Sequence, residues 1–277
     1  MIYFDNHLHL RRDGRFLEAI REFKQAGGTH CILCQYPNPQ KVLREKNYRI
    51  LYQDTLRMAE EIQQKIEITV FVTVGPYPVD YLILRDHIGR EKTLEIMKKG
   101  MEDAAQLCRE HKCIAIGEIG RPHFPVDAQT ISDSNEIMIS GMIQAKDAGV
   151  PVVLHTESTT PQLCKELVTI AQNIQFPVEK IVKHYAPPLI TEQENYGLLP
   201  SVLASKKNII EALKKGSRFL METDYIDDPL RPGAVLSPKT VPNRTKNLLK
   251  QGIMTEQQAY EIHKNLPQKT YGIDLSE

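Results

Sequence analysis

The chain has 277 residues, of which 41% are hydrophobic and 25% charged, a composition typical of folded globular proteins. Basic and acidic residues balance at 35 each. This balance argues against a protein that coats nucleic acid, although an enzyme acting on nucleic acid needs only a local basic rim. We find no signal-peptide pattern and no apolar run of membrane-spanning length. The five scattered cysteines indicate reduced thiols, so we expect a cytoplasmic protein.

Short apolar segments alternate with stretches of helical period along the whole chain. The apolar segments are rich in Ile, Val and Leu and show little polar alternation, as buried parallel strands do. We predict strands at 2–10, 29–36, 66–75, 113–120, 151–156, 180–185, 197–203 and 218–224. We predict helices at 15–27, 47–65, 93–111, 134–149, 160–174 and 205–216, and further helices at roughly 243–251 and 255–271. Several open on a capping residue, namely Asp133 or Ser134, Thr160 and Ser205.

Eight strands that alternate with helices predict a parallel sheet. In a chain of this length, the count favours an α/β fold with a single (β/α)8 TIM-like barrel over an open sheet. No G-x-G-x-x-G motif follows the first strand, so the main sign of a dinucleotide-binding sheet is missing. The chain shows no linker or break in composition. We therefore expect one domain over residues 1–277.

Several predicted strands carry a potential metal ligand at their carboxyl end. These residues are His7 and His9 on the first strand, then Glu118, His155, His184 and Asp224 on the fourth, fifth, sixth and eighth. Each alone could be a helix cap or a partner of a loop carbonyl. In a parallel barrel, however, all six would meet at the rim where active sites lie. Six ligands suffice for two divalent ions that share a carboxylate, drawn from Zn, Mn, Mg, Fe, Ni or Co.

The order of these motifs, "HLH", "AIGEIG", "VVLHTES" and "FLMETD", resembles the TatD family of metal-dependent hydrolases in the amidohydrolase superfamily. The resemblance runs the whole chain and implies a TIM-like barrel with DNase-like activity. It implies that His7 and His9 bind a first metal, that His155 and His184 bind a second, and that Glu118 is shared. It further implies that Asp224 ligates the first metal and acts as the catalytic general base.

The substrate-facing loops depart from the family pattern. The family carries "GxHPH" after the third strand, "GLDY" after the shared Glu and "FHCFSG" after the sixth strand. This chain has "VGPYPVDY", "GRPHF" and "VKHYAPP" at those places. The loops at 75–80 and 121–125 therefore predict a different substrate pocket, and a divergent, archaeal-type branch is the better match.

Four residues near the predicted rim are candidate substrate contacts. Arg121 and His123 follow the shared Glu, and a guanidinium suits recognition of phosphate or carboxylate. A structural ion pair of Arg121 is an equal alternative. Arg231 and Arg244 lie in the long segment after Asp224 and could reach over the mouth, or belong to a solvated loop. We expect Lys183, which precedes His184, to point away from it by strand alternation.

The sequence therefore predicts a hydrolase that activates a metal-bound water to cleave a phosphodiester or phosphoester bond. Its substrate would be DNA or a small phosphoester, with no membrane partner. Hydrolysis of a lactone, ester or amide is the alternative. A catalytically silent metal-binding barrel is a third reading, motivated by the altered loops. The sequence does not identify the native metal, the native substrate or the oligomeric state.

Overall fold

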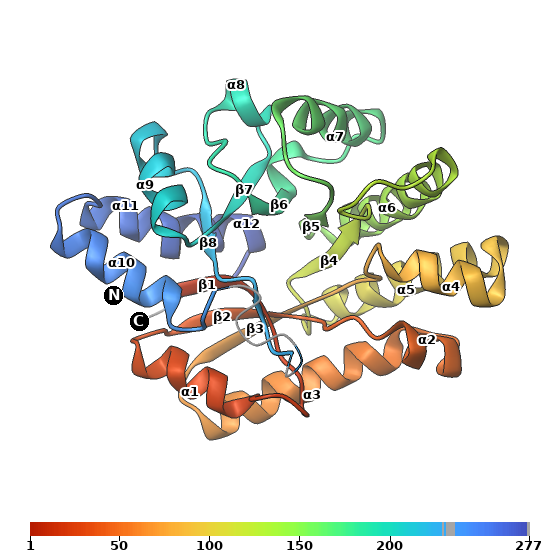
Figure 1. Cartoon of the computed structure of the whole chain (residues 1–277), viewed down its shortest axis with the longest axis horizontal. Helices are drawn as coiled ribbons and strands as arrows, with labels where there is room; N and C mark the ends of the chain where they lie inside the picture. Colours follow the sequence, from red (N-terminus) through yellow and green to blue (C-terminus); the bar gives the residue numbers. More distant parts are fainter. Residues whose placement is uncertain (229, 231–235, 276–277) are drawn as a thin grey trace.

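The apolar segments form parallel strands of a sheet that curls into a TIM-like barrel with helices around it (Figure 1), as predicted. The computed structural model describes residues 1–228, 230 and 236–275. Its strands are β1 (Phe4–His9), β2 (His30–Cys34), β3 (Thr69–Val74), β4 (Ala115–Gly120), β5 (Val152–His155), β6 (Ile181–Ala186), β7 (Leu199–Leu203), β8 (Leu220–Glu222) and β9 (Tyr225–Ile226). They lie in the order β8-β7-β6-β5-β4-β3-β2-β1-β9.

The barrel closes where the last predicted strand ends. The expected strand at 218–224 contains β8, and a second short strand, β9, follows Thr223 and Asp224 beyond the predicted end. β8 pairs with β7, whereas β9 pairs with β1 through Leu8 and His9. Asp224 has a φ of 47°, which places it in the left-handed region that Asp tolerates better than most residues. The break between β8 and β9 lets β9 pair with β1, which closes the sheet, and it sets the position of Asp224.

The helices lie outside the strands in Figure 1. They are α1 (Leu17–Gln25), α2 (Pro39–Glu45), α3 (Arg49–Lys65), α4 (Asp80–Ile88), α5 (Arg90–Arg109), α6 (Ala128–Ala148), α7 (Pro161–Asn173), α8 (Glu192–Asn195), α9 (Lys206–Lys215), α10 (Thr240–Lys250), α11 (Glu256–Tyr260) and α12 (Leu266–Tyr271). A 3-10 turn at Val178–Lys180 and a π turn at Glu261–Asn265 complete the helical set of the described residues. The sequence did not predict α2, α4 and α8.

Helix caps agree with the sequence at two positions and differ at a third. The side chains of Thr160 and Ser205 accept backbone N–H bonds at the starts of α7 and α9, as predicted. The prediction of Asp133 or Ser134 as the cap of α6 was wrong, because Asp127 accepts the N–H of Thr130 and the helix begins at Ala128. Asp133 lies inside the helix, where its buried carboxylate binds the Arg90 guanidinium at 2.7 Å.

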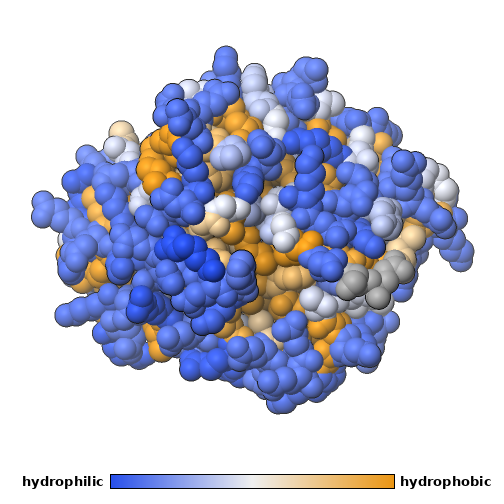
Figure 2. All heavy atoms as spheres, turned by 180° about the vertical axis from the view of Figure 1, so that it is seen from behind, coloured by the Kyte–Doolittle hydropathy of each residue, from blue (hydrophilic) through white to orange (hydrophobic). Residues whose placement is uncertain are grey.

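One apolar layer inside the barrel supports the carboxyl-terminal rim from below. It takes buried side chains from β1, β2 and β4–β8, and α12 adds Leu266 and Tyr271. The strand residues are Phe4, Ile32, Cys34, Ala115, Val153, Val182, Leu199 and Leu220. Outside, the surface seen from behind is hydrophilic over most of its periphery, with hydrophobic residues toward its middle (Figure 2).

None of the helices in the described part of the chain combines the length and the apolar character needed to cross a bilayer.

A buried histidine fastens the carboxyl-terminal helices to the first strand. His263 accepts the backbone N–H of Phe4 at Nδ1, at 3.2 Å, and its Nε2 lies 2.8 Å from the Thr245 hydroxyl. The Thr245 hydroxyl can donate to the Val241 carbonyl at 3.1 Å, so a neutral ring with its proton on Nε2 satisfies both ring nitrogens. His263 is therefore neutral in the fold. Burial lowers its pKa from 6.5 to about 4.

We predict that His263→Gln makes the free energy of unfolding depend less on pH in the acid range. Between pH 6.5 and about 4, the unfolded chain binds a proton at His263 that the folded chain excludes, so acidification destabilises the wild type. This histidine contributes a slope of up to about 1.4 kcal/mol per pH unit. Urea unfolding of both proteins between pH 4.5 and 8 measures it. Parallel curves across that range would contradict the prediction.

Candidate metal centre

The six predicted ligands meet at the carboxyl-terminal rim of the barrel. His7 and His9 leave the same face of β1 because side chains on a strand alternate. Glu118 comes from β4, and Asp224 follows β8 directly. The remaining two are His155 at the end of β5 and His184 on β6. All are buried except His155, which is partly exposed.

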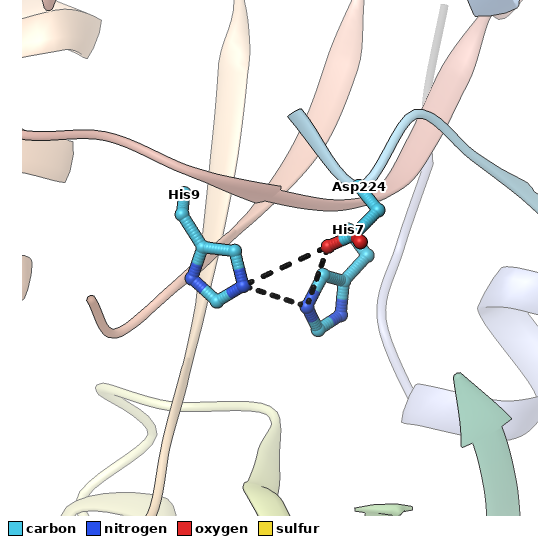
Figure 3. A group of neighbouring side chains, drawn as sticks. All are labelled: His7, His9 and Asp224. Carbon is cyan, nitrogen blue, oxygen red and sulfur yellow. Dashed lines mark hydrogen bonds and ion pairs between the residues drawn. The ribbon is translucent and has the colours of Figure 1, made fainter. Parts of the chain in front are cut away.

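Two overlapping groups of side chains bring their ligand atoms within 4.8 Å of one another. The first is His7, His9 and Asp224, drawn in Figure 3. In it the two Nε2 atoms are 3.1 Å apart, and Asp224 Oδ1 is 3.9 Å from each. The second is His7, Glu118 and His184. Glu118 Oε1 lies 3.0 Å from His184 Nε2 and Oε2 lies 3.3 Å from His9 Nε2, so this carboxylate faces both groups.

His155 stands at the edge of this arrangement. Its Nδ1 is 3.1 Å from Glu118 Oε1. Its Nε2 is 3.0 Å from His123 Nδ1 and 3.3 Å from the Tyr77 hydroxyl. The tight groups found among the described residues do not include it. His155 therefore connects the metal ligands to both of the altered loops, because Tyr77 belongs to 75–80 and His123 to 121–125.

The charge states of His7 and Glu118 suit divalent ions. Burial lowers the pKa of His7 to about 4, so its imidazole is neutral at pH 7. Burial alone would raise the pKa of Glu118, but the nearby His184 and His7 imidazoles hold it well below its usual range. Neutral imidazole and ionised carboxylate are the forms that ligate metals. Burial raises the pKa of Asp224 to about 7, and the Glu222 and Glu118 carboxylates, acting against burial, raise the pKa of His184 well above its usual value. His9 Nδ1 is buried without a hydrogen-bond partner in the described structure, which also leaves Nε2 aimed at the centre.

The sequence analysis missed Glu222, a buried carboxylate behind His184. Its Oε1 accepts from His184 Nδ1 at 3.0 Å and from the Tyr185 N–H at 2.7 Å, while Oε2 accepts the Ser201 hydroxyl at 2.5 Å. This contact keeps the Nδ1 proton on the far side and directs Nε2 toward Glu118. The i, i+2 spacing of Glu222 and Asp224 in "ETD" could have drawn attention to it.

The arginine candidates lie differently from the expectation. Arg121 is 2% exposed, and its guanidinium donates to Asn135, Glu157 and Glu166 at 2.7, 3.1 and 2.5 Å. Of the two alternatives for Arg121, substrate recognition or a structural ion pair, the structure therefore shows the ion pair. Arg244 lies on α10, where its Nε donates to the Ala204 carbonyl at 3.2 Å. Arg231 lies outside the described residues.

Two cavities open above the ligands and share part of their walls. One, of about 230 Å³, is lined by His9, Tyr36, Pro37, Tyr77, Glu118, His155, His184, Asp224 and Ile226. The other, of about 440 Å³, is lined by Tyr77, His123, His155, Thr156, Glu157, Ser158, Lys183, His184, Tyr185, Asp224 and Ile226. His123 is thus at the mouth, as expected, whereas Arg121 and Arg244 do not line either cavity.

We predict that Glu222→Gln weakens metal binding without unfolding the barrel. The amide loses the charge that holds the His184 proton at Nδ1, so affinity for the ion at His184 should fall by about 10- to 100-fold. Competition with a chromophoric chelator measures this, and Glu60→Gln on the exposed side of α3 is the matched control. Equal affinities for the Glu222 variant and the wild type would contradict the role given to Glu222.

Solved structures of known proteins share the fold of this chain. The TatD homologue YjjV of Escherichia coli superposes with a TM-score of 0.69 at 19% identity and covers 98% of both chains. The phosphotriesterase homology protein of E. coli, solved with phosphate in its active site, gives a TM-score of 0.63 at 12% identity. The superposition covers 97% of this chain and 98% of that one. At these identities the two structures show a shared fold.

Sequence relatives identify the family. The protein MJ1127 of Methanocaldococcus jannaschii, described as uncharacterised, is 35% identical over 274 residues, which cover 98% of this chain and 96% of its own length. The sequence profile of TatD-related DNases matches residues 4–272. The match spans all six rim ligands and agrees with the resemblance seen in the motifs. The chain therefore belongs to the TatD-related DNase family of metal-dependent hydrolases.

Proposed function

We propose that this chain is a binuclear metal-dependent hydrolase that cleaves a phosphoester bond in a small substrate. The convergence of four imidazoles and two carboxylates at one rim carries the proposal. We assign one divalent ion to His7, His9 and Asp224, and the second to Glu118 and His184 with His155 beside them. Glu118 is the shared ligand. The site would be formed by one domain over residues 1–277.

The side chains of this centre divide the work of hydrolysis. When bound, divalent ions at such a centre lower the pKa of a water molecule and polarise the oxygen under attack. Asp224 lines both cavities, so its carboxylate can take a proton from the attacking water and pass it to the leaving group. Tyr36, Tyr77 and Ile226 line the cavity around the ligands.

The charges near the mouth favour a small substrate over long DNA. A neighbouring hollow of about 510 Å³ is lined by Arg11, Arg12 and Lys41, among others. Each of the three is ion-paired: Arg11 with Asp13 at 2.6 Å, Arg12 with Glu61 at 2.7 Å, and Lys41 with Asp54. Binding of a polynucleotide backbone depends on cations free to neutralise phosphates.

The five free cysteines are all buried, and free thiols favour the reducing cytoplasm as the location of the protein.

We predict that Asp224→Asn lowers hydrolysis by at least about 100-fold, because the amide cannot accept a proton. Protein purified without chelator should carry more than one ion per chain by elemental analysis. Chelation should lower its melting temperature, since ions that bind only the folded state stabilise it. Asp147→Asn, exposed on α6, is the matched control. Fewer than about one ion per chain, or full activity of the Asp224 variant, would contradict the proposal.

A substrate panel separates phosphoester cleavage from the alternatives. With Mg, Mn, Zn or Co added, we expect turnover of small chromogenic phosphoesters to exceed that of single-stranded DNA, lactones and amides. A preference for lactones or neutral esters would replace the phosphoester assignment with an amidohydrolase-type activity. Full metal loading without turnover of any compound would favour a silent metal-binding barrel.

A further inference from the structure

Lys183 lies in the wall of the active-site cavity, although it precedes a metal ligand on the same strand. Strand alternation starts its side chain on the face opposite to that of His184. The long side chain still reaches the end of the strand, where Nζ donates to the His184 carbonyl oxygen at 2.5 Å. Lys183 therefore lines the 440 Å³ cavity together with His155 and Asp224, as we did not expect from the sequence.

The charge of Lys183 lacks a direct counter-ion. Its side chain is 2% exposed, and the described structure gives its amine one hydrogen bond and no carboxylate in ion-pair contact. A buried ammonium is costly unless it is paired. Glu157 lines the same cavity, but its Oε1 is paired with Arg121 at 3.1 Å, and its Oε2 is buried with no hydrogen-bond partner in the described structure, Lys183 included. Two of the three ammonium donors of Lys183 are thus left for another partner.

We propose that Lys183 binds an anionic oxygen of the substrate, phosphoryl or carboxylate, on the side of the cavity formed by β5 and β6. This inference rests on the proposed function, because it places the anion beside the bond to be cleaved. The surrounding wall adds hydroxyl groups from Thr156, Ser158 and Tyr185. The family pattern has Phe before the strand-six histidine, so Lys183 is one of the residues in which this chain departs from that pattern.

Calorimetric titration of the Mn²⁺-loaded protein with inorganic phosphate tests the binding role directly. Lys183→Met should raise the phosphate Kd by about 10- to 100-fold, the loss of one charge-assisted hydrogen bond. Lys183→Arg, which keeps the charge, should recover most of the affinity. The matched control is Lys207→Met, exposed on α9. A parallel titration with acetate distinguishes the two sources, since a loss confined to acetate would assign a carboxylate.

Metal content and thermal unfolding are measured on every variant. If Lys183→Met does not fold, Lys183→Gln replaces it, since the amide removes the charge and can still donate to the His184 carbonyl. Phosphate and acetate binding equal to wild type, in a folded variant with equal metal content, would overturn the inference.

A pair of esters separates this inference from the proposed function. On p-nitrophenyl phosphate, Lys183→Met should lose about 10- to 100-fold in kcat/KM. On neutral p-nitrophenyl acetate, any measurable turnover should be unchanged. Wild type that hydrolyses neither ester but binds phosphate through Lys183 would refute the proposed hydrolase while supporting the anion site. Equal losses on both esters would overturn the anion site and leave the hydrolase standing.

Discussion

The seam between the first and last strands is the constraint on which this centre depends. Asp5, fully buried on β1, accepts the Thr223 N–H at 2.9 Å and the Thr223 hydroxyl at 2.7 Å. The Asp224 N–H donates to the His7 carbonyl at 3.0 Å. These bonds join segments that are more than 200 residues apart in the chain. Together with the pairing of β1 and β9, they hold His7 beside Asp224, because nothing local in the sequence does so.

A second buried network sets the orientation of the ligands from below. The Tyr271 hydroxyl donates to Asn6, and the Asn6 amide donates to the Ser201 hydroxyl, both within 2.9 Å. Ser201 in turn donates to Glu222, which holds His184. Every member has a partner, the condition under which a buried polar network adds rigidity rather than cost. A chain of hydrogen bonds that starts at Tyr271 thus links helix α12 to His184 in the candidate metal centre.

The features that could be predicted are those that depend on residue spacing within a strand or on the parallel arrangement of the strands. The rim ligands could be predicted because parallel strands bring their carboxyl ends together, and the i, i+2 spacing of His7 and His9 fixes their common face. The break between β8 and β9 depends on a φ of 47° at Asp224, which cannot be predicted from the composition of the segment. Glu222 was missed, although it lies two residues before Asp224, because its contact with His184 on β6 arises only when the strands are arranged in the fold. Lys183 was placed by alternation alone, which ignores how far a four-carbon side chain can extend along its strand.

The altered loops and the metal centre are therefore one unit rather than a preserved core with a changed surface. His155 connects them, since one ring nitrogen faces Glu118 while the other faces His123 and Tyr77. A change in either loop alters the hydrogen bonding of a proposed ligand, and so the electron density that it offers an ion. We therefore expect a change in either loop to affect the proposed metal site as well, so that substrate preference and metal preference vary together.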